Sequence, residues 1–268
     1  MTILLTGSNG FVGSRIRDAL DVIPSPSLRD FSEDDIRRLA DTVEPDVIIH
    51  TAAVSDIGAC AADPEGSRRA NVELPLALVK TGVKCVLYST DQVYSGFAEG
   101  GPFREDEVSP ANLYAEEKLE MESRALEINP DTVLLRATWM YDMPRYGSPN
   151  RVNFLVNMLR ANGGEISLSS TEMRGITYVR EVAAHMEEAV SLPGGIYNYG
   201  SEADRGMADL GRLLAEEAGL RIRITEAGPR RNLWMNTDKL KAAGIVFRSS
   251  GEGIVQCCRD YGLGKHGR

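Results

Sequence analysis

The sequence predicts an α/β protein with a doubly wound parallel sheet and a smaller, discontinuous α/β lobe. Two observations carry this prediction: short apolar runs alternate with helical patterns through the first half of the chain, and the first run ends in a glycine-rich turn. Strands that alternate with helices pair in parallel, and the helices cover both faces of the sheet. In such folds, ligands bind beyond the carboxyl ends of the strands.

The alternation runs without a break from the amino terminus to Trp139. In chain order, the predicted elements are a strand over 3–5, a helix near 14–20, a short strand near 22, a helix over 34–43, a strand over 46–53, a helix over 64–81, a strand over 84–90, a helix around 114 and a strand over 132–139. Gly7, Thr51, Thr90 and Thr138 sit near the strand ends, so we expect these segments to converge on one crevice.

After Trp139 the pattern changes, which predicts a departure into the smaller lobe. A proline- and glycine-rich loop at 140–150 comes first, followed by a helix over 152–161 and a turn at 162–164. Residues 175–190 and a strand over 196–200 return to the sheet, and the segments 207–218 and 234–244 leave it again. We therefore assign 1–140 plus 176–200 to the sheet-bearing domain, 141–175 plus 201–250 to the lobe, and 251–268 to a carboxyl-terminal helix and tail.

Length and charge restrict the function. At 268 residues the chain falls between one domain and two. A formal charge of -9 and a pI near 5.0 argue against a surface for nucleic acid or anionic membranes. The first strand leaves no room for a signal peptide, and no apolar stretch approaches the ~18 residues of a membrane span, so we expect a cytoplasmic protein without membrane contact.

The cysteines and histidines predict no metal site. Cys60, Cys85, Cys257 and Cys258 lack paired metal spacing, and the adjacent pair suits neither zinc nor an ordinary disulfide. We expect four free thiols.

The first strand ends in TGSNGFVG, residues 6–13. Gly7, Gly10 and Gly13 would let the backbone turn tightly, approach a pyrophosphate and pack the next helix against the strand. The spacing is GxxGxxG, whereas the usual dinucleotide fingerprint is GxGxxG, and a glycine-rich turn that binds nothing is the alternative. The position at the first strand of an alternating chain favours a dinucleotide-binding Rossmann domain.

Tyr114 and Lys118 are four residues apart in a helical pattern, which stacks the phenol and the ammonium on one face. Two unit charges ~4 Å apart at an effective dielectric of ~20 interact by about 4 kcal/mol. That attraction would move a tyrosine pKa from ~10 towards 7, and burial of the phenol would oppose it. A phenol tuned in this way is a proton donor, although most such pairs are ordinary helix-surface residues.

Seven motifs occur in the order seen in extended short-chain dehydrogenase/reductases: TGSNGFVG, DVIIHTAA, RANVELPLAL, LYSTDQVYSG, YAEEK, LLRATWMY and TYVREVA. The resemblance spans nearly the whole chain. Within that group, STDQVYSG, LLRATWMY, the pair Asn153-Phe154 and MNTDKLKAAGI look most like dTDP-4-dehydrorhamnose reductases and related sugar-nucleotide reductases. The sheet-bearing domain is then the NAD(P)-binding domain, and the lobe binds substrate.

The resemblance implies three catalytic residues. Tyr114 matches the catalytic acid, Lys118 its partner that also grips the nicotinamide ribose, and Thr90 the hydroxyl that orients the substrate carbonyl. A hydride would reach a ketone carbon while Thr90 and Tyr114 donate hydrogen bonds to the oxygen as it becomes an alkoxide. The alternative for Thr90 is a strand-end hydroxyl that satisfies a local backbone group.

The resemblance also implies the residues that hold the cofactor: Gly7, Asn9, Gly10, Phe11, Val12, Gly13, Asp30, Phe31, Ala52, Ala53, Tyr114 and Lys118. Asn71 matches a structural asparagine of the family. NAD enzymes place an acid near the end of the second strand, but residues 22–29 read VIPSPSLR. The hydroxyls and Arg29 would tolerate a 2′-phosphate, so we expect NADPH, with NADH as the alternative.

The expected substrate is a nucleotide-diphosphate sugar. Planar guanidinium groups bind diphosphates well, and Arg174 is the first candidate for that contact. Arginine at this place is a departure from the dehydrorhamnose-reductase pattern, which tends to have glycine, and this bears on which sugar is bound. Trp139 and Asn153 would floor the sugar pocket. The remaining arginine candidates, Arg136, Arg230 and Arg231, fit salt bridges better.

Two other functions stay open. An NAD-dependent epimerase would share the fold, whereas a dehydratase is disfavoured because Asp91 is followed by Gln92 and not by the glutamate of the dehydratase pair. A non-catalytic NADP-binding regulatory subunit could retain Thr90, Tyr114 and Lys118. The sequence is compatible with a homodimer.

Overall fold

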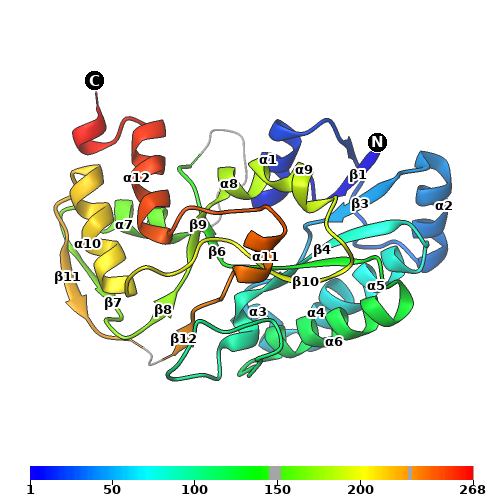
Figure 1. The fold of residues 1–268 in the computed structure, drawn as a ribbon, viewed down its shortest axis with the longest axis horizontal. Coiled ribbons are helices and arrows are strands. Elements are labelled where there is room, and N and C mark those ends of the chain that lie inside the picture. Colours follow the sequence, from blue (N-terminus) through cyan, green and yellow to red (C-terminus); the bar gives the residue numbers. More distant parts are fainter. Residues whose placement is uncertain (145–151, 229–230, 268) are drawn as a thin grey trace. The chain divides into compact units, whose positions relative to one another are not determined.

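The computed structural model describes residues 1–144, 152–228 and 231–267. The chain forms two compact units. Figure 1 draws the ribbon of these residues, coloured along the sequence. Unit 1 comprises 1–93, 110–136 and 183–197, and unit 2 comprises 94–109, 137–182 and 198–268. The predicted assignment of cofactor binding to one domain and substrate binding to the other stays a prediction.

Unit 1 carries the predicted parallel sheet. Its strand order is β10-β5-β4-β3-β1-β2, and β1 pairs in parallel with both β2 and β3, as β3 does with β4. The strands are β1 (Ile3–Thr6), β2 (Ile23–Pro24), β3 (Val47–His50), β4 (Lys84–Thr90), β5 (Val133–Ala137) and β10 (Gly195–Tyr199), of which β5 and β10 continue into unit 2. The predicted doubly wound α/β fold is therefore confirmed.

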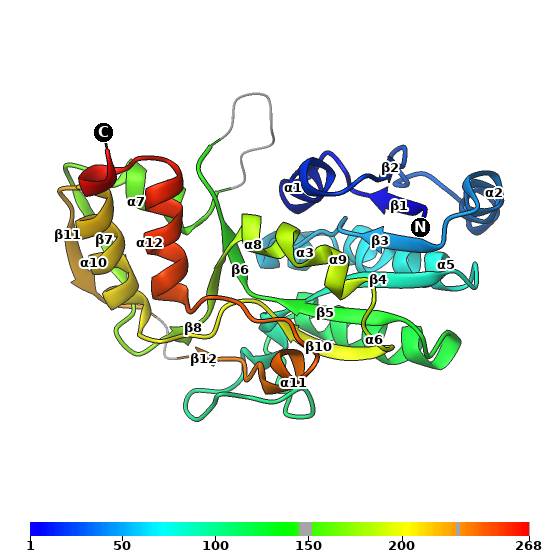
Figure 2. The ribbon, with the colours of Figure 1, turned by 45° about the horizontal axis from the view of Figure 1, so that its top comes forward.

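Helices alternate with these strands, as Figure 2 shows. They are α1 (Phe11–Ala19), α2 (Glu33–Val43), α3 (Ile57–Ala62), α4 (Pro64–Arg68), the π-helix η1 (Arg69–Glu73), α5 (Leu74–Val79), the 3-10 helix η2 (Asp91–Tyr94), α6 (Leu113–Ile128), α8 (Val179–Ala184) and α9 (Met186–Ala189). The helix predicted over 64–81 is thus three successive helical pieces, with a π-helical turn in the middle.

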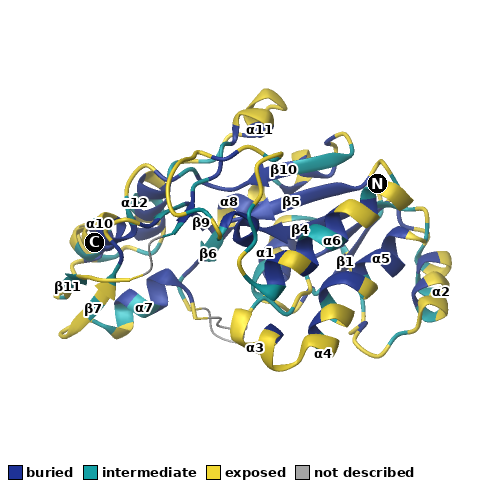
Figure 3. Ribbon diagram, turned by 90° about the horizontal axis from the view of Figure 1, so that it is seen from below, coloured by how far each residue is buried: buried dark blue, intermediate teal, exposed yellow. Residues whose placement is uncertain are grey.

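The core of unit 1 lies between the sheet and helices α2, α5 and α6, and α5 contacts both α2 and α6. Alternate strand residues such as Leu4, Ile48 and Leu87 face Leu76 and Met121 of the helices there. Figure 3 shows these central strands as buried. Apolar side chains therefore cover much of the sheet where these helices pack on it.

The described residues of unit 2 form three parallel two-stranded pairs, β6–β9, β7–β11 and β8–β12. Its strands are β6 (Trp139–Tyr141), β7 (Glu165–Leu168), β8 (Met173–Arg174), β9 (Ile176–Tyr178), β11 (Arg223–Glu226) and β12 (Asn232–Leu233). Its helices are α7 (Phe154–Arg160), α10 (Met207–Ala218), α11 (Asp238–Ala242), α12 (Ser250–Asp260) and the 3-10 helix η3 (Gly264–His266). A second apolar core joins α7, α10 and α12 to β6 and β9.

The described residues contain neither a membrane-spanning helix nor a cluster of metal ligands. No helix there is long and apolar enough to cross a membrane. The same residues contain no group of three or more His, Cys, Asp or Glu side chains placed to hold a metal. All four cysteines are buried free thiols, as expected.

Candidate active site

The glycine turn after β1 has room for backbone only. Gly7 has a φ of +73°, and a Cβ there would meet Thr51 Oγ1 at 2.7 Å and the Ala52 nitrogen at 2.8 Å. A Cβ on Gly13 would lie 2.2 Å from the Gly7 carbonyl oxygen. The Thr51 hydroxyl donates to the Thr6 carbonyl at 2.9 Å and so joins the ends of β1 and β3. These close approaches explain why glycine occupies both positions.

Helix α1 begins with its amino end open. Its N-cap is Gly10, which provides no side-chain cap, and its first turn carries no acidic residue. Phe11 and Val12 form the first turn and are half-buried, whereas Asn9 and Gly10 are exposed. Uncapped N–H groups at a helix start attract phosphate. The turn therefore fits the pyrophosphate of a dinucleotide.

Two further loops supply the other expected cofactor residues. Ala52 and Ala53, after β3, are both exposed. Asn71 of η1 anchors that loop, because its side chain accepts from the Val54 nitrogen at 3.0 Å and donates to the Val54 carbonyl at 2.9 Å. The structural role expected of Asn71 is thus visible.

The loop after β2 is open on its outer side. Arg29 and Asp30 are exposed, and Phe31 is half-buried with its carbonyl bound by Arg69 at 2.8 Å. The Ser25 hydroxyl donates to the Pro26 carbonyl. Arg29 and these hydroxyls are therefore on an accessible loop, as a 2′-phosphate contact requires.

Helix α6 places the tyrosine and the lysine. Its N-cap, Asn112, accepts from the Ala115 nitrogen at 3.0 Å and reaches Gln92 at 3.4 Å, which links the helix to the turn after β4. Tyr114 is 6% exposed, and Lys118 Nζ lies 6.0 Å from the centre of its ring. Lys118 Nζ also donates to the Tyr88 carbonyl of β4 at 2.9 Å. The expected stacking of phenol and ammonium is present.

Burial dominates the electrostatics of Lys118. It lowers the pKa of the ammonium to about 8, against the attraction of the Glu122 and Glu117 carboxylates. Glu122 is held by Arg136, whose Nε and Nη2 reach its two oxygens at 2.9 and 2.6 Å. Arg136, a minor candidate for the diphosphate, is thus fully buried in an ion pair.

Thr90 ends β4 and is 5% exposed. Its hydroxyl accepts from the Gln92 nitrogen at 3.1 Å and points a weak donor contact at the Asp91 carboxylate at 3.4 Å. The bond from the Gln92 nitrogen is the local backbone contact expected if Thr90 is only a structural residue at the end of its strand. It uses one lone pair of the hydroxyl, so it does not by itself decide between the two roles.

In unit 2, Trp139 and Arg174 lie together. The Arg174 guanidinium is 5.3 Å from the centre of the Trp139 ring, and Phe154 meets that ring edge-on at 6.1 Å. Both Trp139 and Arg174 are half-buried. A guanidinium on a tryptophan face has fewer orientations to lose on binding a diphosphate.

The remaining substrate candidates are less accessible. Asn153 is 2% exposed and caps α7, with its oxygen bound by the Val156 nitrogen at 3.0 Å and its amide donating to the Asp142 carbonyl at 3.1 Å. Arg231 pairs with Glu172 at 2.8 Å, as a salt-bridging residue would. Arg230 and most of the loop predicted at 140–150 lie outside the described residues.

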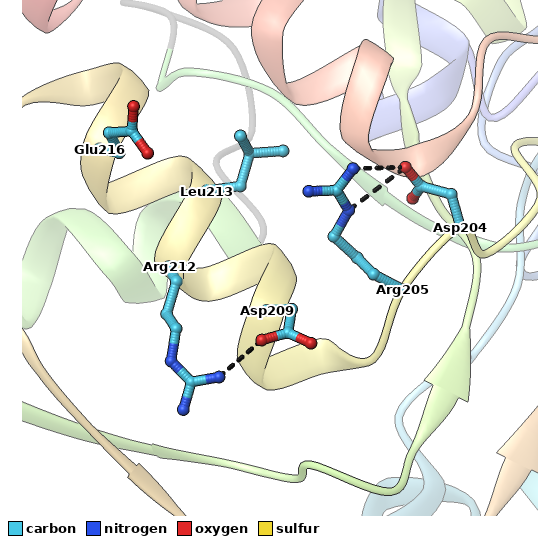
Figure 4. Close-up of a pocket in the computed structure, with 6 residues that line it drawn as sticks. All are labelled: Asp204, Arg205, Asp209, Arg212, Leu213 and Glu216. Carbon is cyan, nitrogen blue, oxygen red and sulfur yellow. Dashed lines mark hydrogen bonds and ion pairs between the residues drawn. The ribbon is translucent and has the colours of Figure 1, made fainter.

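A shallow hollow of about 350 Å³ lies on α10 of unit 2, lined by Asp204, Arg205, Asp209, Arg212, Leu213 and Glu216 (Figure 4). Its arginines are engaged: Arg205 pairs with Asp204 at 3.0 Å and Arg212 with Asp209 at 2.6 Å. None of the predicted site residues lines it, and its charges are already paired. The hollow is therefore not the candidate active site.

The sequence did not reveal two groups that lie near Lys118, the Tyr88 carbonyl and the Glu117 carboxylate. The Tyr88 carbonyl has no sequence signal, because any residue supplies a carbonyl. Glu117 sits directly before Lys118 and is only 4% exposed, yet a glutamate in a helix normally indicates a solvated face. Only the packing of α6 against η1 reveals it.

Comparisons with known proteins identify the family of this chain. A model of the family described as the RmlD substrate binding domain matches residues 1–232. The dTDP-4-dehydrorhamnose reductase of Salmonella typhimurium is 30% identical over 254 residues, which cover 84% of this chain and 82% of that protein. The Burkholderia thailandensis protein of the same name is 29% identical over 195 residues, and the match spans 68% of this chain and 63% of the relative.

Among solved structures, dTDP-4-dehydrorhamnose reductase from Bacillus anthracis in complex with NADP has a TM-score of 0.84 at 19% identity, covering 97% of this chain and 99% of that chain. At this identity the likeness shows the fold alone. The fold, the motif order and the matched family together define an oxidoreductase of the extended short-chain dehydrogenase/reductase class. Within that class, the chain belongs to the RmlD substrate binding domain family.

Proposed function

We propose that this chain reduces a 4-keto nucleotide sugar with NADPH, in the manner of a dTDP-4-dehydrorhamnose reductase. The observation that carries the proposal is the arrangement of α6 on β4. Lys118 is buried beside the Tyr114 ring and bound to the Tyr88 carbonyl, two residues before Thr90. An ordinary surface pair would not be buried or anchored in this way. The name of the Salmonella typhimurium relative supplies the substrate class.

The glycine turn would hold the pyrophosphate of the cofactor, and the loops at 52–53 and 30–31 its ribose and adenine. When bound, the reduced nicotinamide supplies the hydride. Lys118 holds a ribose hydroxyl and steadies the Tyr114 phenolate. Tyr114 donates its proton to the carbonyl oxygen of the substrate, and Thr90 donates a hydrogen bond to the same oxygen. The NADP-bound Bacillus anthracis structure supports the choice of cofactor.

The substrate would be held by unit 2. Arg174 would bind the diphosphate and Trp139 would form an apolar floor for the sugar, with Asn153 supporting it from the start of α7. The stacked arrangement of Arg174 on Trp139 supports this assignment.

The test is a substrate panel. The purified protein is incubated with NADPH and dTDP-, UDP-, GDP- and CDP-4-keto sugars while absorbance at the nicotinamide band is followed. The proposal expects NADPH consumption with at least one of them. Interconversion of sugars without NADPH consumption would identify an epimerase, and binding of NADPH without turnover of any sugar would favour a regulatory subunit.

A further inference from the structure

Glu117 of α6 is a buried carboxylate that takes part in a chain of short hydrogen bonds. Its side chain belongs to a residue that is only 4% exposed. Its Oε2 accepts from Ser67 Oγ of α4 at 2.6 Å and from Asn71 Nδ2 of η1 at 2.9 Å. Because burying a carboxylate is costly, one that is held by two placed donors calls for an explanation.

Asn71 extends the chain of bonds to the loop after β3. Its Oδ1 accepts from the Val54 nitrogen at 3.0 Å, and its Nδ2 donates to the Val54 carbonyl at 2.9 Å as well as to Glu117. An amide nitrogen has two hydrogens, and these two acceptors use both. A reversed amide would set its oxygen against the carboxylate and the Val54 carbonyl. The fully buried Asn71 side chain is therefore satisfied in one orientation.

The loop at 51–54 lies against the glycine turn. The Thr51 hydroxyl bonds the last carbonyl of β1 at 2.9 Å, and a Cβ on Gly7 would lie 2.8 Å from the Ala52 nitrogen. Ala52 and Ala53 themselves are exposed. A small movement of this loop would therefore change the space beside the turn that is expected to hold the pyrophosphate.

The π-helical turn η1 places Asn71 between its two partners. It contacts α4, α5 and α6, and π-helical turns often occur at functional sites. Helix α6 also carries Tyr114 and Lys118. The bonds from Glu117 through Asn71 to Val54 thus join the helix of the catalytic candidates to the loop of the cofactor candidates.

We propose that Glu117 is a positioning residue for the cofactor site: it holds the Asn71 amide, and through it the loop at 51–54, in the place that NADPH requires. The effect on NADPH rests on the proposed function, whereas the hold on Val54 does not. Without the carboxylate, one hydrogen of the Asn71 amide loses its acceptor. The Ser67 hydroxyl, 3.2 Å from Nδ2, then draws the amide away from Val54.

This hold depends on an acceptor oxygen and not on a negative charge. Glu117→Gln keeps one acceptor oxygen for Ser67 and Asn71. Glu117→Met is of similar length and equally uncharged, but its thioether is only a weak acceptor. The two variants therefore differ in the one property that the proposal uses.

The direct test is hydrogen exchange of the Val54 amide, followed by nuclear magnetic resonance on the protein without ligand. In Glu117→Met this amide should exchange about tenfold faster, the effect of losing one hydrogen bond. In Glu117→Gln it should exchange near the wild-type rate. The rate is compared with that of Ile48 in the middle of β3, which reports global unfolding. The matched control is Glu116→Met, which replaces an exposed glutamate of the same helix and should leave Val54 unchanged.

Three results would overturn the proposal. The first is an unchanged Val54 rate in Glu117→Met, and the second is an equal rise in the methionine and glutamine variants. The third is an equal acceleration at Val54 and Ile48, which would mean that Glu117 only stabilises the fold. Should Glu117→Met fail to fold, Glu117→Leu takes its place in the comparison with Glu117→Gln.

Calorimetric titration with NADPH tests the consequence for the cofactor. The dissociation constant should rise about tenfold in Glu117→Met, and it should stay near the wild-type value in Glu117→Gln and Glu116→Met. If the exchange rates follow the expected pattern but the wild type binds no NADPH, the hold on Val54 is supported and the proposed function fails. If NADPH binds Glu117→Met as tightly as the wild type, the positioning role is wrong.

Discussion

Lys118 Nζ donates to the Tyr88 carbonyl over 2.9 Å, which fixes the middle of α6 to β4 two residues before Thr90. The lysine therefore has one donor committed to the scaffold, and an ammonium has two more. In the proposed mechanism, these donors bind a ribose hydroxyl and the phenolate of Tyr114. The bond to the Tyr88 carbonyl holds α6 against the end of β4 that carries Thr90.

Tyr114→Phe should lower turnover by roughly 10²- to 10⁴-fold, the usual effect of losing a general acid. NADPH affinity should hardly change, because the glycine turn and Lys118 are intact. Steady-state kinetics and calorimetric titration measure the two quantities on one preparation. Wild-type turnover in the variant would remove Tyr114 from the mechanism.

Lys118 should make the stability of the protein depend on pH. Burial lowers the pKa of its ammonium from the ordinary 10.5 to about 8. Between these values the unfolded chain holds a proton that the folded chain has released, so the free energy of unfolding rises with pH. Relative to Lys118→Met, the wild type should gain up to about 3 kcal/mol across that interval.

Urea unfolding at a series of pH values measures this gain. Lys239→Met, which removes an exposed lysine from α11, is the control and should track the wild type. If the free energies of unfolding of the wild type and of Lys118→Met change equally with pH, Lys118 has the same pKa in the folded and unfolded protein. That result would contradict the prediction.

Arg174→Ala should raise the apparent substrate constant by roughly ten- to a hundredfold, the effect of losing one charge-assisted contact. The matched control is Arg180→Ala, since Arg180 also lies over an aromatic ring, 4.9 Å from the centre of Tyr261. That control should leave the substrate constant near the wild-type value. If Arg174→Ala is equally impaired with a keto substrate that lacks the nucleotide diphosphate, the pocket assignment is wrong.

The protein should bind NADPH more tightly than NADH, because residues 22–29 contain no acid and Arg29 is exposed. Arg29→Asp should reverse or abolish this preference, whereas Arg37→Asp on the exposed face of α2 should not. Calorimetric titration with both cofactors gives the ratio. If the wild type binds NADH as tightly as NADPH or more tightly, the loop at 25–29 does not recognise the 2′-phosphate and only connects β2 to α2.

Local periodicity predicts much of this fold. The alternation from β1 to β5 and the helix over 207–218 can be read from apolar patterns, because burial repeats along each element. The strand predicted over 132–139 is instead two strands, β5 and β6. The break falls at Thr138, whose hydroxyl bonds that of Thr177 at 2.5 Å. A partner 39 residues away leaves no mark on local pattern.

Some features of the candidate site can also be predicted from local sequence, whereas others depend on contacts between separate segments. Glycine spacing and the Tyr114–Lys118 interval report geometry that neighbouring residues dictate, so the sequence carries them. The π-helical turn that aims Asn71 at Glu117 depends on contacts among α4, η1 and α6. The second bond of the Asn153 side chain, from its amide to the Asp142 carbonyl, joins residues 11 positions apart. Such contacts join separate segments, and a single sequence does not show them.

The central claim is tested most directly by following the hydride itself. The protein is incubated with NADPH deuterated at the transferred position and with the 4-keto nucleotide sugar that the panel identifies, and the product is examined by mass spectrometry and nuclear magnetic resonance. The account predicts one deuterium on the former carbonyl carbon of the sugar, formed much more slowly by Tyr114→Phe. Sugar product without deuterium, or deuterium delivered at the same rate by Tyr114→Phe, would contradict it.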